Sequence, residues 1–289
     1  MLSKFPACPI LFAFHGRRLP IFRVNLYSSE AAPRPKPVLD LMRKLTRLEE
    51  CHLRIEVCSS EEEWTQEYRE MDPLGFSSLR ILTISKWSYQ DYIPLVQVLD
   101  RLTLPILKKL QVSCGREDLL DSDDTFTAIH NLLNRSGPPP ISVLHFNHAE
   151  VPAGEFLNVL RTCPTLEDIR LTSVNKGAIR GETLLQLTLK VDGTAPLVPR
   201  LHILHISGKM PFDMQTFVNM VESRWTLAHV QTPPLRCLSE VNLCRFIDAD
   251  DGQDEDKDEV EHITVLSALD VYKEQGMNVT LGTKVQPKS

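Results

Sequence analysis

The sequence lacks the short motifs that are typical of common catalytic and metal-binding sites. It contains no H-E-x-x-H metalloprotease motif, no G-x-S-x-G nucleophile turn and no Walker-type phosphate loop. The glycine-rich βα turns of nucleotide-binding α/β folds are also missing. These absences favour a protein that is not an enzyme and that uses no cofactor. A hydrolase with a dispersed active site remains the alternative from a different functional class.

Paired cysteines, long apolar runs and an excess of basic charge are missing too. The seven cysteines include no C-x-x-C pair, which argues against a disulfide framework and against a zinc site. No apolar stretch approaches the ~20 residues that span a bilayer. The net charge is −6, and no global basic field points to nucleic acid. We therefore expect an intracellular protein, cytoplasmic or nuclear, without a metal, a membrane or a nucleic acid as partner.

What the sequence does contain is a recurring L-x-x-L-x-L pattern. Each unit places two apolar side chains one residue apart, so both lie on the same face of a short strand. We find nine units, which begin at Ile21, Leu48, Leu79, Leu107, Ile141, Leu166, Leu201, Leu238 and Gly276.

The residue between the last two apolar positions is polar in every unit. A strand that is buried on both faces would be apolar at these positions as well. Each strand is therefore predicted to have one buried face and one solvent-facing face. The nine outward residues are Asn25, His52, Thr83, Gln111, His145, Arg170, His205, Asn242 and Thr280.

Segments with helical spacing separate the strands. Apolar residues recur every three or four positions, as in Phe156, Leu157, Val159 and Leu160, which marks one buried helical stripe. Strand and helix in strict alternation predict an α/β fold, namely an irregular leucine-rich repeat solenoid, a horseshoe with parallel strands on its concave face and helices on its convex face. The predicted helical segments begin near Pro37, Tyr92, Asp124, Pro152 and Pro211.

The predicted domain organisation is simple. Residues 1–20 form an N-terminal segment, and residues 21–289 form the repeat domain. The segment 248–261 holds nine acidic residues and one lysine. Like charges extend a chain, so this segment is predicted to be a flexible loop rather than a calcium site. An EF-hand alignment on Gly252 would place Ile247 and Ala249 at ligand positions, which they cannot fill.

Three runs of the sequence resemble a known family. They are LDRLTLPILKKLQVS, GPPPISVLHFNHAEVPAGEFLNVLRTCPTLEDIRL and LVPRLHILHISGKMPFDMQTFVNMVESRW, and the second contains a Cys-Pro-x-Leu entry to a repeat at Cys163. They resemble the leucine-rich repeat region of the F-box-like proteins of mushroom-forming fungi. The resemblance implies repeats that hold a substrate, while an N-terminal F-box docks on the adaptor of a cullin ubiquitin ligase. Because the first predicted strand begins at Ile21, we expect residues 1–20 to be too few for an F-box, and adaptor binding is implied only if an F-box is supplied upstream.

The candidate binding surface lies on the solvent-facing side of the strands. His145, Arg170 and His205 are predicted to form a row that recognises an acidic or phosphorylated peptide. Arg170 would make bidentate contacts to the anion, and the histidines would add charge in mildly acidic solution. The alternative is a generic polar face on which Asp168 cancels Arg170. Further candidate residues of this surface are Asn147, Thr172, Ser207, Gln111 and Asn242, and Val143, Asp168 and Ile203 flank the row on its other side.

Cys163 is the residue that most resembles a candidate nucleophile. It follows a predicted helix, whose C-terminal dipole disfavours a thiolate, and no histidine lies nearby in the sequence. We expect a buried structural cysteine. The histidine pairs at His202 and His205, and at His145 and His148, have a three-residue spacing that places their side chains on opposite faces of a strand, which argues against a metal site.

The predicted function is therefore a protein-interaction scaffold, the substrate-recognition region of an F-box-like ubiquitin ligase receptor. A stand-alone leucine-rich repeat adaptor without a ligase link is the nearest alternative.

Overall fold

The protein is described by a computed structural model, which has two compact units, residues 1–141 and 142–289. The description covers residues 21–26, 43–45, 47–55, 72–86, 93–114, 122–148, 152–174, 179–190, 196–210, 212–226, 237–248 and 267–286.

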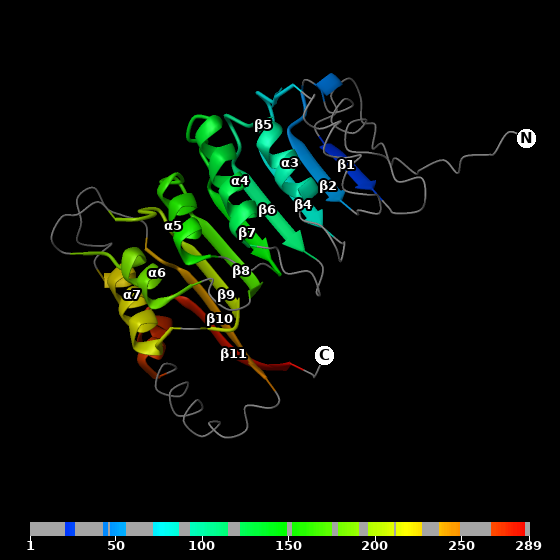
Figure 1. The fold of residues 1–289 in the computed structure, drawn as a ribbon. Helices are drawn as coiled ribbons and strands as arrows, with labels where there is room; N and C mark the ends of the chain where they lie inside the picture. Colours follow the sequence, from blue (N-terminus) through cyan, green and yellow to red (C-terminus); the bar gives the residue numbers. More distant parts are fainter. Residues whose placement is uncertain are drawn as a thin grey trace, which may run out of the picture. The chain divides into compact units, whose positions relative to one another are not determined.

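The first unit contains a parallel sheet whose strands follow the chain order. Neighbouring strands pair as β1–β2, β2–β4 and β4–β6. Two helices lie over one face of this sheet (Figure 1). A two-stranded parallel ladder, which the sequence pattern did not predict, joins β3 to β5. The bounds are β1 Ile21–Leu26, β2 Glu50–Ile55, β3 Leu74–Gly75, β4 Ile81–Lys86, α3 Ile93–Arg101, β5 Leu102–Thr103, β6 Lys109–Cys114 and α4 Ser122–Arg135.

The second unit repeats this arrangement with longer strands at its end. The parallel pairs are β7–β8, β8–β9, β9–β10 and β10–β11, again in chain order. Helices α5, α6 and α7 lie over one face of the sheet (Figure 1). The bounds are β7 Val143–Asn147, α5 Ala153–Arg161, β8 Asp168–Val174, α6 Gly181–Leu187, β9 Ile203–Gly208, α7 Met214–Thr226, β10 Glu240–Asp248 and β11 Asn278–Gln286, and residues 267–274 are helical.

All nine predicted strands are present, and they are parallel, which confirms the α/β class. In eight of the units the strand begins two residues after the first apolar position, as at Leu166 and Asp168. That first apolar residue is buried beneath the turn that enters the strand, as Leu107, Ile141, Leu166 and Leu201 all are.

The predicted division into a buried and a solvent-facing side is also confirmed. In β7 and β9, buried residues alternate with partly exposed ones. Four of the buried side chains, Leu144, Phe146, Ile169 and Leu171, are at most 1% exposed. Because alternate side chains of a strand point to opposite faces, the polar residues between them lie on the side away from the core.

The first predicted L-x-x-L-x-L repeat, which begins at Ile21, is out of register with the other repeats. Backbone pairing aligns Arg23, rather than Asn25, with His52, while Asn25 pairs with Arg54. The apolar residues at Phe22 and Val24 are the ones that align with Cys51 and Leu53. The error arose because alternating apolar residues at 22, 24 and 26 fit the pattern equally well in two registers.

Four predicted helical segments are confirmed as α3, α4, α5 and α7. The segment near Pro37 lies mostly outside the described residues. Helix α6, which the sequence reasoning missed, is only seven residues long. It contributes Leu184 and Leu187 to the core, a stripe too short for periodicity to reveal.

The acidic segment lies almost wholly outside the described residues. Its first member, Asp248, belongs to β10 instead of the predicted loop. No helix in the described parts of the chain is both long and apolar enough to cross a membrane.

Candidate functional site

The sequence-predicted row of outward residues in the second unit is brought together by strand register. His145 pairs with Arg170, and Arg170 pairs with His205. The row continues through Asn242 to Thr280. We call the side of the β7–β11 sheet that carries these residues the open face. All of them except Thr280 are partly exposed, and Thr280 is exposed.

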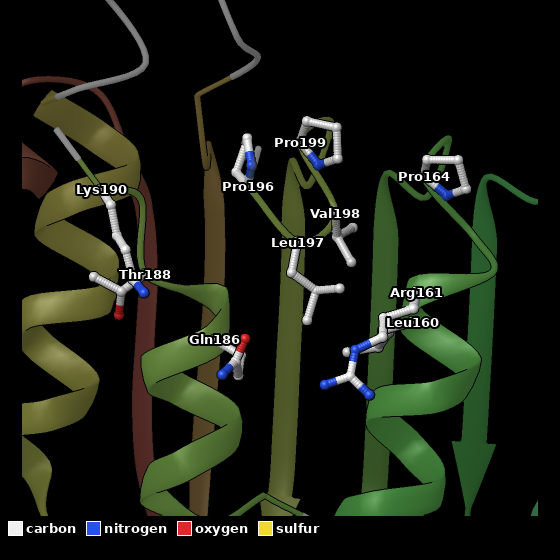
Figure 2. A pocket seen from close by; sticks show the side chains of 10 residues that line it. All are labelled: Leu160, Arg161, Pro164, Gln186, Thr188, Lys190, Pro196, Leu197, Val198 and Pro199. Atoms are coloured by element: carbon white, nitrogen blue, oxygen red, sulfur yellow. The ribbon is translucent and has the colours of Figure 1, made fainter. Parts of the chain in front are cut away.

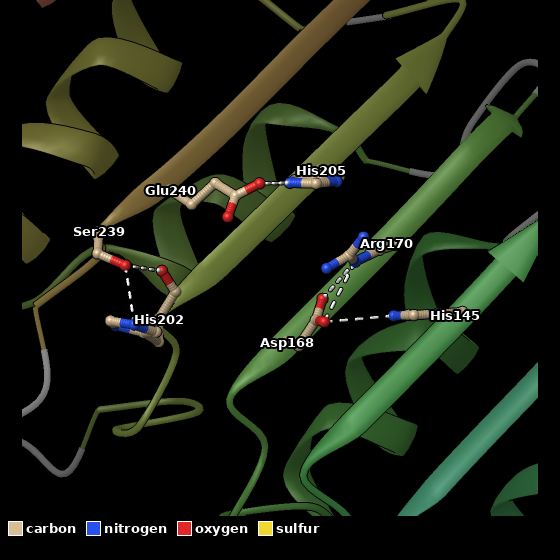
Figure 3. A network of polar contacts seen from close by, with 7 residues as sticks. All are labelled: His145, Asp168, Arg170, His202, His205, Ser239 and Glu240. Carbon is tan, nitrogen blue, oxygen red and sulfur yellow. Dashed lines mark hydrogen bonds and ion pairs between the residues drawn. The ribbon is translucent and has the colours of Figure 1, made fainter. Parts of the chain in front are cut away.

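Asp168 is the centre of a small polar cluster on the open face. Its carboxylate accepts hydrogen bonds from Arg170 Nε at 3.0 and 3.1 Å and faces His145 Nε2 at 3.4 Å (Figure 3). Burial opposes ionisation of this carboxyl, but the hydrogen bonds and charges of His145 and Arg170 outweigh it and hold the pKa of Asp168 below its ordinary value. The Arg170–Asp168 ion pair of the alternative interpretation is therefore present.

The ion pair leaves part of Arg170 available. Only Nε of its guanidinium is bonded to a described residue, and 37% of the side chain is exposed. A guanidinium presents five N–H donors, so the four on the terminal nitrogens lie beyond the Asp168 contact. Asp168 thus orients the fork while its outer edge can still meet an acceptor.

A second contact between a basic side chain and a carboxylate lies further along the row. His205 Nε2 contacts Glu240 Oε1 at 2.6 Å, and the glutamate comes from the next strand (Figure 3). Glu240 and Asp168 occupy the same position in their repeat units, the third. In the compact unit of residues 1–141, Glu50 is the third residue of the repeat that begins at Leu48, and its carboxylate contacts His52. The third position is not acidic in the other repeats, so these carboxylates do not form a continuous column. Sequence reasoning placed Asp168 beside the row but missed the contacts of Glu240 and Glu50.

His202 and Ser239 form a hydrogen-bonded pair at the point where β9 and β10 begin. The carbonyl oxygen of Cys237 lies 3.0 Å from His202 Nδ1, which must therefore carry the proton. Ser239 Oγ lies 2.9 Å from His202 Nε2 and 3.4 Å from the His202 carbonyl oxygen, and these two acceptors compete for its single proton when the imidazole is neutral (Figure 3). This order of hydroxyl, imidazole and orienting oxygen is also found in activated serine nucleophiles. Sequence reasoning missed the pair because the two residues are 37 positions apart.

The flanking residues fit the predicted rows less well. Asn147 pairs with Thr172 as expected, but the ladder between β8 and β9 is irregular from Leu171 to Val174. Ser173 has a φ of 53°, and its backbone N–H donates to Ser207 Oγ at 3.0 Å. Thr172 and Ser207 are consequently not paired, which corrects the prediction of a straight third row. An irregularity of this kind adds a residue to one strand and shifts the pairing that follows.

Gln111 is a candidate residue of the other compact unit, residues 1–141. It lies on β6 of the first unit, where it pairs with Thr83. Val143 and Ile203 do flank the row, since both pair with Asp168.

Cys163 is buried, as predicted. It is 0% exposed, and burial raises its thiol pKa to about 11, against a smaller opposing effect of the Thr162 hydroxyl. No group of three histidine, cysteine or carboxylate side chains suited to a metal ion occurs among the residues that the structure describes.

Comparison with known proteins gives no family assignment. No protein-family model matches the sequence, and none of the curated proteins searched matches it.

Proposed function

We propose that this chain is a protein-interaction scaffold that binds an acidic or phosphorylated peptide on its open face. The observation that carries the proposal is the anchoring of Arg170 by Asp168 through Nε alone. A guanidinium held in this way presents its outer nitrogens in a fixed orientation, which favours a bidentate contact with carboxylate or phosphate.

The solenoid interpretation is part of this proposal. It is supported by the order of the strands, which follows the order of the chain without a reversal in each compact unit. A doubly wound sheet instead reverses its strand order at a switch point, where its ligand binds. It also covers both faces with helices, whereas helices α3 to α7 lie over one face of each sheet (Figure 1). In a repeat solenoid the uncovered strand face is the usual binding surface.

The electrostatics of the open face favour a small anionic group over an extended acidic surface. Asp168 and Glu240 already neutralise much of the positive charge that Arg170, His145 and His205 could supply. The site therefore relies on directed hydrogen bonds more than on net charge. Asn242, next to His205 in the row, adds an amide that can donate to a peptide carbonyl.

The ligase role is the more specific part of the proposal. On the resemblance to F-box-like proteins, the bound peptide would be a substrate destined for ubiquitination. The cullin adaptor would then be recruited through an F-box supplied upstream of these repeats. A stand-alone adaptor would use the same open face without that link.

The test uses the full chain against an array of peptides in phosphorylated, acidic and neutral versions. We expect binding of phosphorylated or acidic members, and a loss of about tenfold or more in affinity for Arg170→Gln. Arg170→Lys should recover only part of the affinity, because an ammonium group lacks the bidentate fork. Arg180→Gln is the matched control, because Arg180 is an exposed arginine at the start of α6. Equal binding by wild type and Arg170→Gln would remove Arg170 from the site.

The ligase role has its own test. The chain is expressed with its upstream sequence, and the purified cullin adaptor is used as bait. Retention of the adaptor supports the receptor role, whereas peptide binding without adaptor retention supports the stand-alone adaptor.

A hydrolase remains the second candidate because of the pair formed by Ser239 and His202. In such a reaction the Ser239 oxygen would attack the acyl carbon of an ester or amide while its proton passes to His202 Nε2. The bond to the leaving alcohol or amine would break as that group takes the proton from His202, and water would then hydrolyse the acyl-serine to the acid and restore the Ser239 hydroxyl. Treatment with a fluorophosphonate probe separates the two functions. The scaffold proposal expects no labelling of Ser239, whereas labelling that disappears in His202→Ala would favour the hydrolase.

A further inference from the structure

Basic side chains gather at two places in the second unit, and only one of them can hold a single small anion. A pocket of about 320 Å³ lies at the ends of α5 and α6 (Figure 2). Its two cations, Arg161 and Lys190, lie on opposite sides of it, so they are not placed to share one anion. On the open face, by contrast, Arg170 and His205 pair directly in the β8–β9 ladder.

His205 lies one strand spacing from Arg170, about 4.8 Å between backbones, and has a fixed contact of its own. Its Nε2 contacts Glu240 Oε1 at 2.6 Å, and 20% of its side chain is exposed. No residue that the structure describes contacts the other ring nitrogen, Nδ1. His205 is therefore held at one nitrogen and open to a ligand at the other.

The contact with Glu240 decides which nitrogen of His205 carries the proton. An ionised carboxylate can only accept a hydrogen bond, so Nε2 must donate. In the neutral imidazole Nδ1 is then an acceptor, because only one ring nitrogen carries hydrogen. The imidazolium form has a second N–H, on Nδ1. Proton uptake therefore converts Nδ1 of His205 from an acceptor into a donor.

Nδ1 is directed toward the Arg170 side of the strand. β8 and β10 flank β9 on opposite sides, and Glu240 belongs to β10. The nitrogen that Glu240 does not contact lies on the far side of the ring (Figure 3). Arg170 is bonded to Asp168 through Nε, so its terminal nitrogens remain for a ligand. Because each donor approaches an anionic oxygen to about 2.7–2.9 Å, one small anion can bridge two neighbouring strands.

From these contacts we infer that the anion of the bound peptide lies between Arg170 and His205 and binds together with one proton, which His205 takes up on Nδ1. Neutral His205 would direct a lone pair at the anion, whereas the imidazolium donates a hydrogen bond and adds a positive charge. The inference rests on the proposed anion-binding role of the open face and adds its regulation. Affinity should rise as the pH falls into the mildly acidic range where imidazoles ionise.

The groups around His205 explain why the proton and the anion would bind together. Glu240 of β10 and Asp168 of β8 both favour a positive imidazole, and Arg170 opposes it. A bound anion offsets the charge of Arg170 and so removes this opposition. The remaining neighbours on β10 are Asn242, which pairs with His205, and Cys244 two residues further on.

His145 is on the other side of Arg170 and has a different environment. Its Nε2 lies 3.4 Å from Asp168 Oδ2, and the same carboxylate accepts from Arg170 Nε. A carboxylate thus already lies between His145 and Arg170, where an incoming anion would be repelled. His145 is therefore the matched control for His205.

The experiment titrates inorganic sulfate into the full chain at constant ionic strength and follows the Arg170 backbone amide by NMR. Sulfate keeps its charge between pH 6 and 8, whereas a phosphate ester titrates near a pKa of about 6. We expect several-fold tighter binding at pH 6 than at pH 8, with a limit of about tenfold per pH unit for uptake of one proton. Equal affinity at both pH values would overturn the inference alone. Sulfate that leaves Arg170 unperturbed at both would count against the open-face anion site itself, and the inference would fall with it.

Variants separate proton uptake from simple charge. His205→Gln should abolish the pH dependence, whereas His145→Gln should keep it even if the affinity itself changes. Glu240→Gln should bind nearly as well at pH 8 as at pH 6, because the amide can donate to Nε2 and leave the proton of neutral His205 on Nδ1. Asp270→Asn removes one negative charge at an exposed position of the 267–274 helix and should leave the pH dependence unchanged.

The tautomer of His205 can be read without any variant. Imidazole ¹⁵N shifts of the wild-type protein at pH 8 should show hydrogen on Nε2 and a bare Nδ1. A neutral form with hydrogen on Nδ1 would contradict the inference, as would a pH dependence of sulfate binding that persists in His205→Gln.

Discussion

Arg224 Nε donates a 2.7 Å hydrogen bond to the carbonyl oxygen of Leu187, which lies 37 positions earlier at the end of α6. The same device occurs in the first unit, where Arg135 Nη2 donates to the Leu99 carbonyl at 2.8 Å near the end of α3. Each arginine adjoins a serine that accepts the backbone N–H following the capped helix. Ser136 accepts from Leu104, and Ser223 accepts from Leu189.

The two arginines differ in burial, which predicts different effects on stability. Arg224 is 1% exposed, and burial lowers its pKa to about 9, so it remains cationic at neutral pH. Arg224→Met would remove the donor to three carbonyls, two of them in buried hydrogen bonds, and we expect a loss of about 2–4 kcal/mol of unfolding free energy. Arg135→Met should cost about 1 kcal/mol or less, because Arg135 is exposed and its hydrogen bonds to the Leu99 and Leu102 carbonyls are only part-buried. Urea unfolding of both variants measures the difference. Equal losses would contradict the role assigned to burial.

Asp168 makes stability depend on pH. Its pKa is lowered in the folded protein, so its ionised form contributes stability above the ordinary aspartate pKa of about 3.9. That contribution is lost as the pH falls through the lowered folded pKa. We expect Asp168→Asn to be about 1 kcal/mol less stable than wild type at pH 7, with the difference shrinking towards pH 3. Urea unfolding at pH 7, 5 and 3.5 tests this. A difference that stays constant with pH would show that Asp168 does not titrate as described.

Neighbouring residues on β8 should respond oppositely to truncation. Leu171 is 1% exposed and faces the helices, so Leu171→Ala should cost about 2–5 kcal/mol through lost burial and a residual cavity. The side chain of Arg170 is 37% exposed on the open face, so Arg170→Ala should cost about 1 kcal/mol or less. Thermal or urea unfolding measures both. Comparable losses would mean that the two faces of β8 are not distinguished as the structure indicates.

Cysteine alkylation should follow burial. Burial raises the thiol pKa of Cys51 and Cys163, and both residues are 0% exposed. Cys237 and Cys244 are partly exposed. With N-ethylmaleimide at pH 7.5, we expect mass spectrometry to find label on Cys244 in the native protein, and on Cys51 and Cys163 only after unfolding. Rapid native labelling of Cys163 would revive its interpretation as a reactive thiol.

The strands could be predicted from sequence because their pattern is local. An apolar pair one residue apart, with a polar residue between, reports the two faces of one strand wherever it occurs. Pairing partners required more. The repeat that begins at Ile21 shows this. Val24 and Leu26 fit the pattern, yet the ladder aligns Phe22 and Val24 with the apolar pair of the next strand, Cys51 and Leu53.

The sequence by itself determined the α/β class, the nine strands, the polar row through His145, Arg170 and His205 and the burial of Cys163, because each depends on side-chain periodicity within a few residues. Only the tertiary structure decided how the charges on those strands are paired. Arg170 is held by Asp168, His205 meets Glu240, and Ser239 meets His202. Two of these contacts join residues 35 and 37 positions apart. Such contacts depend on strand register and rotamer, which a single repeat unit does not encode.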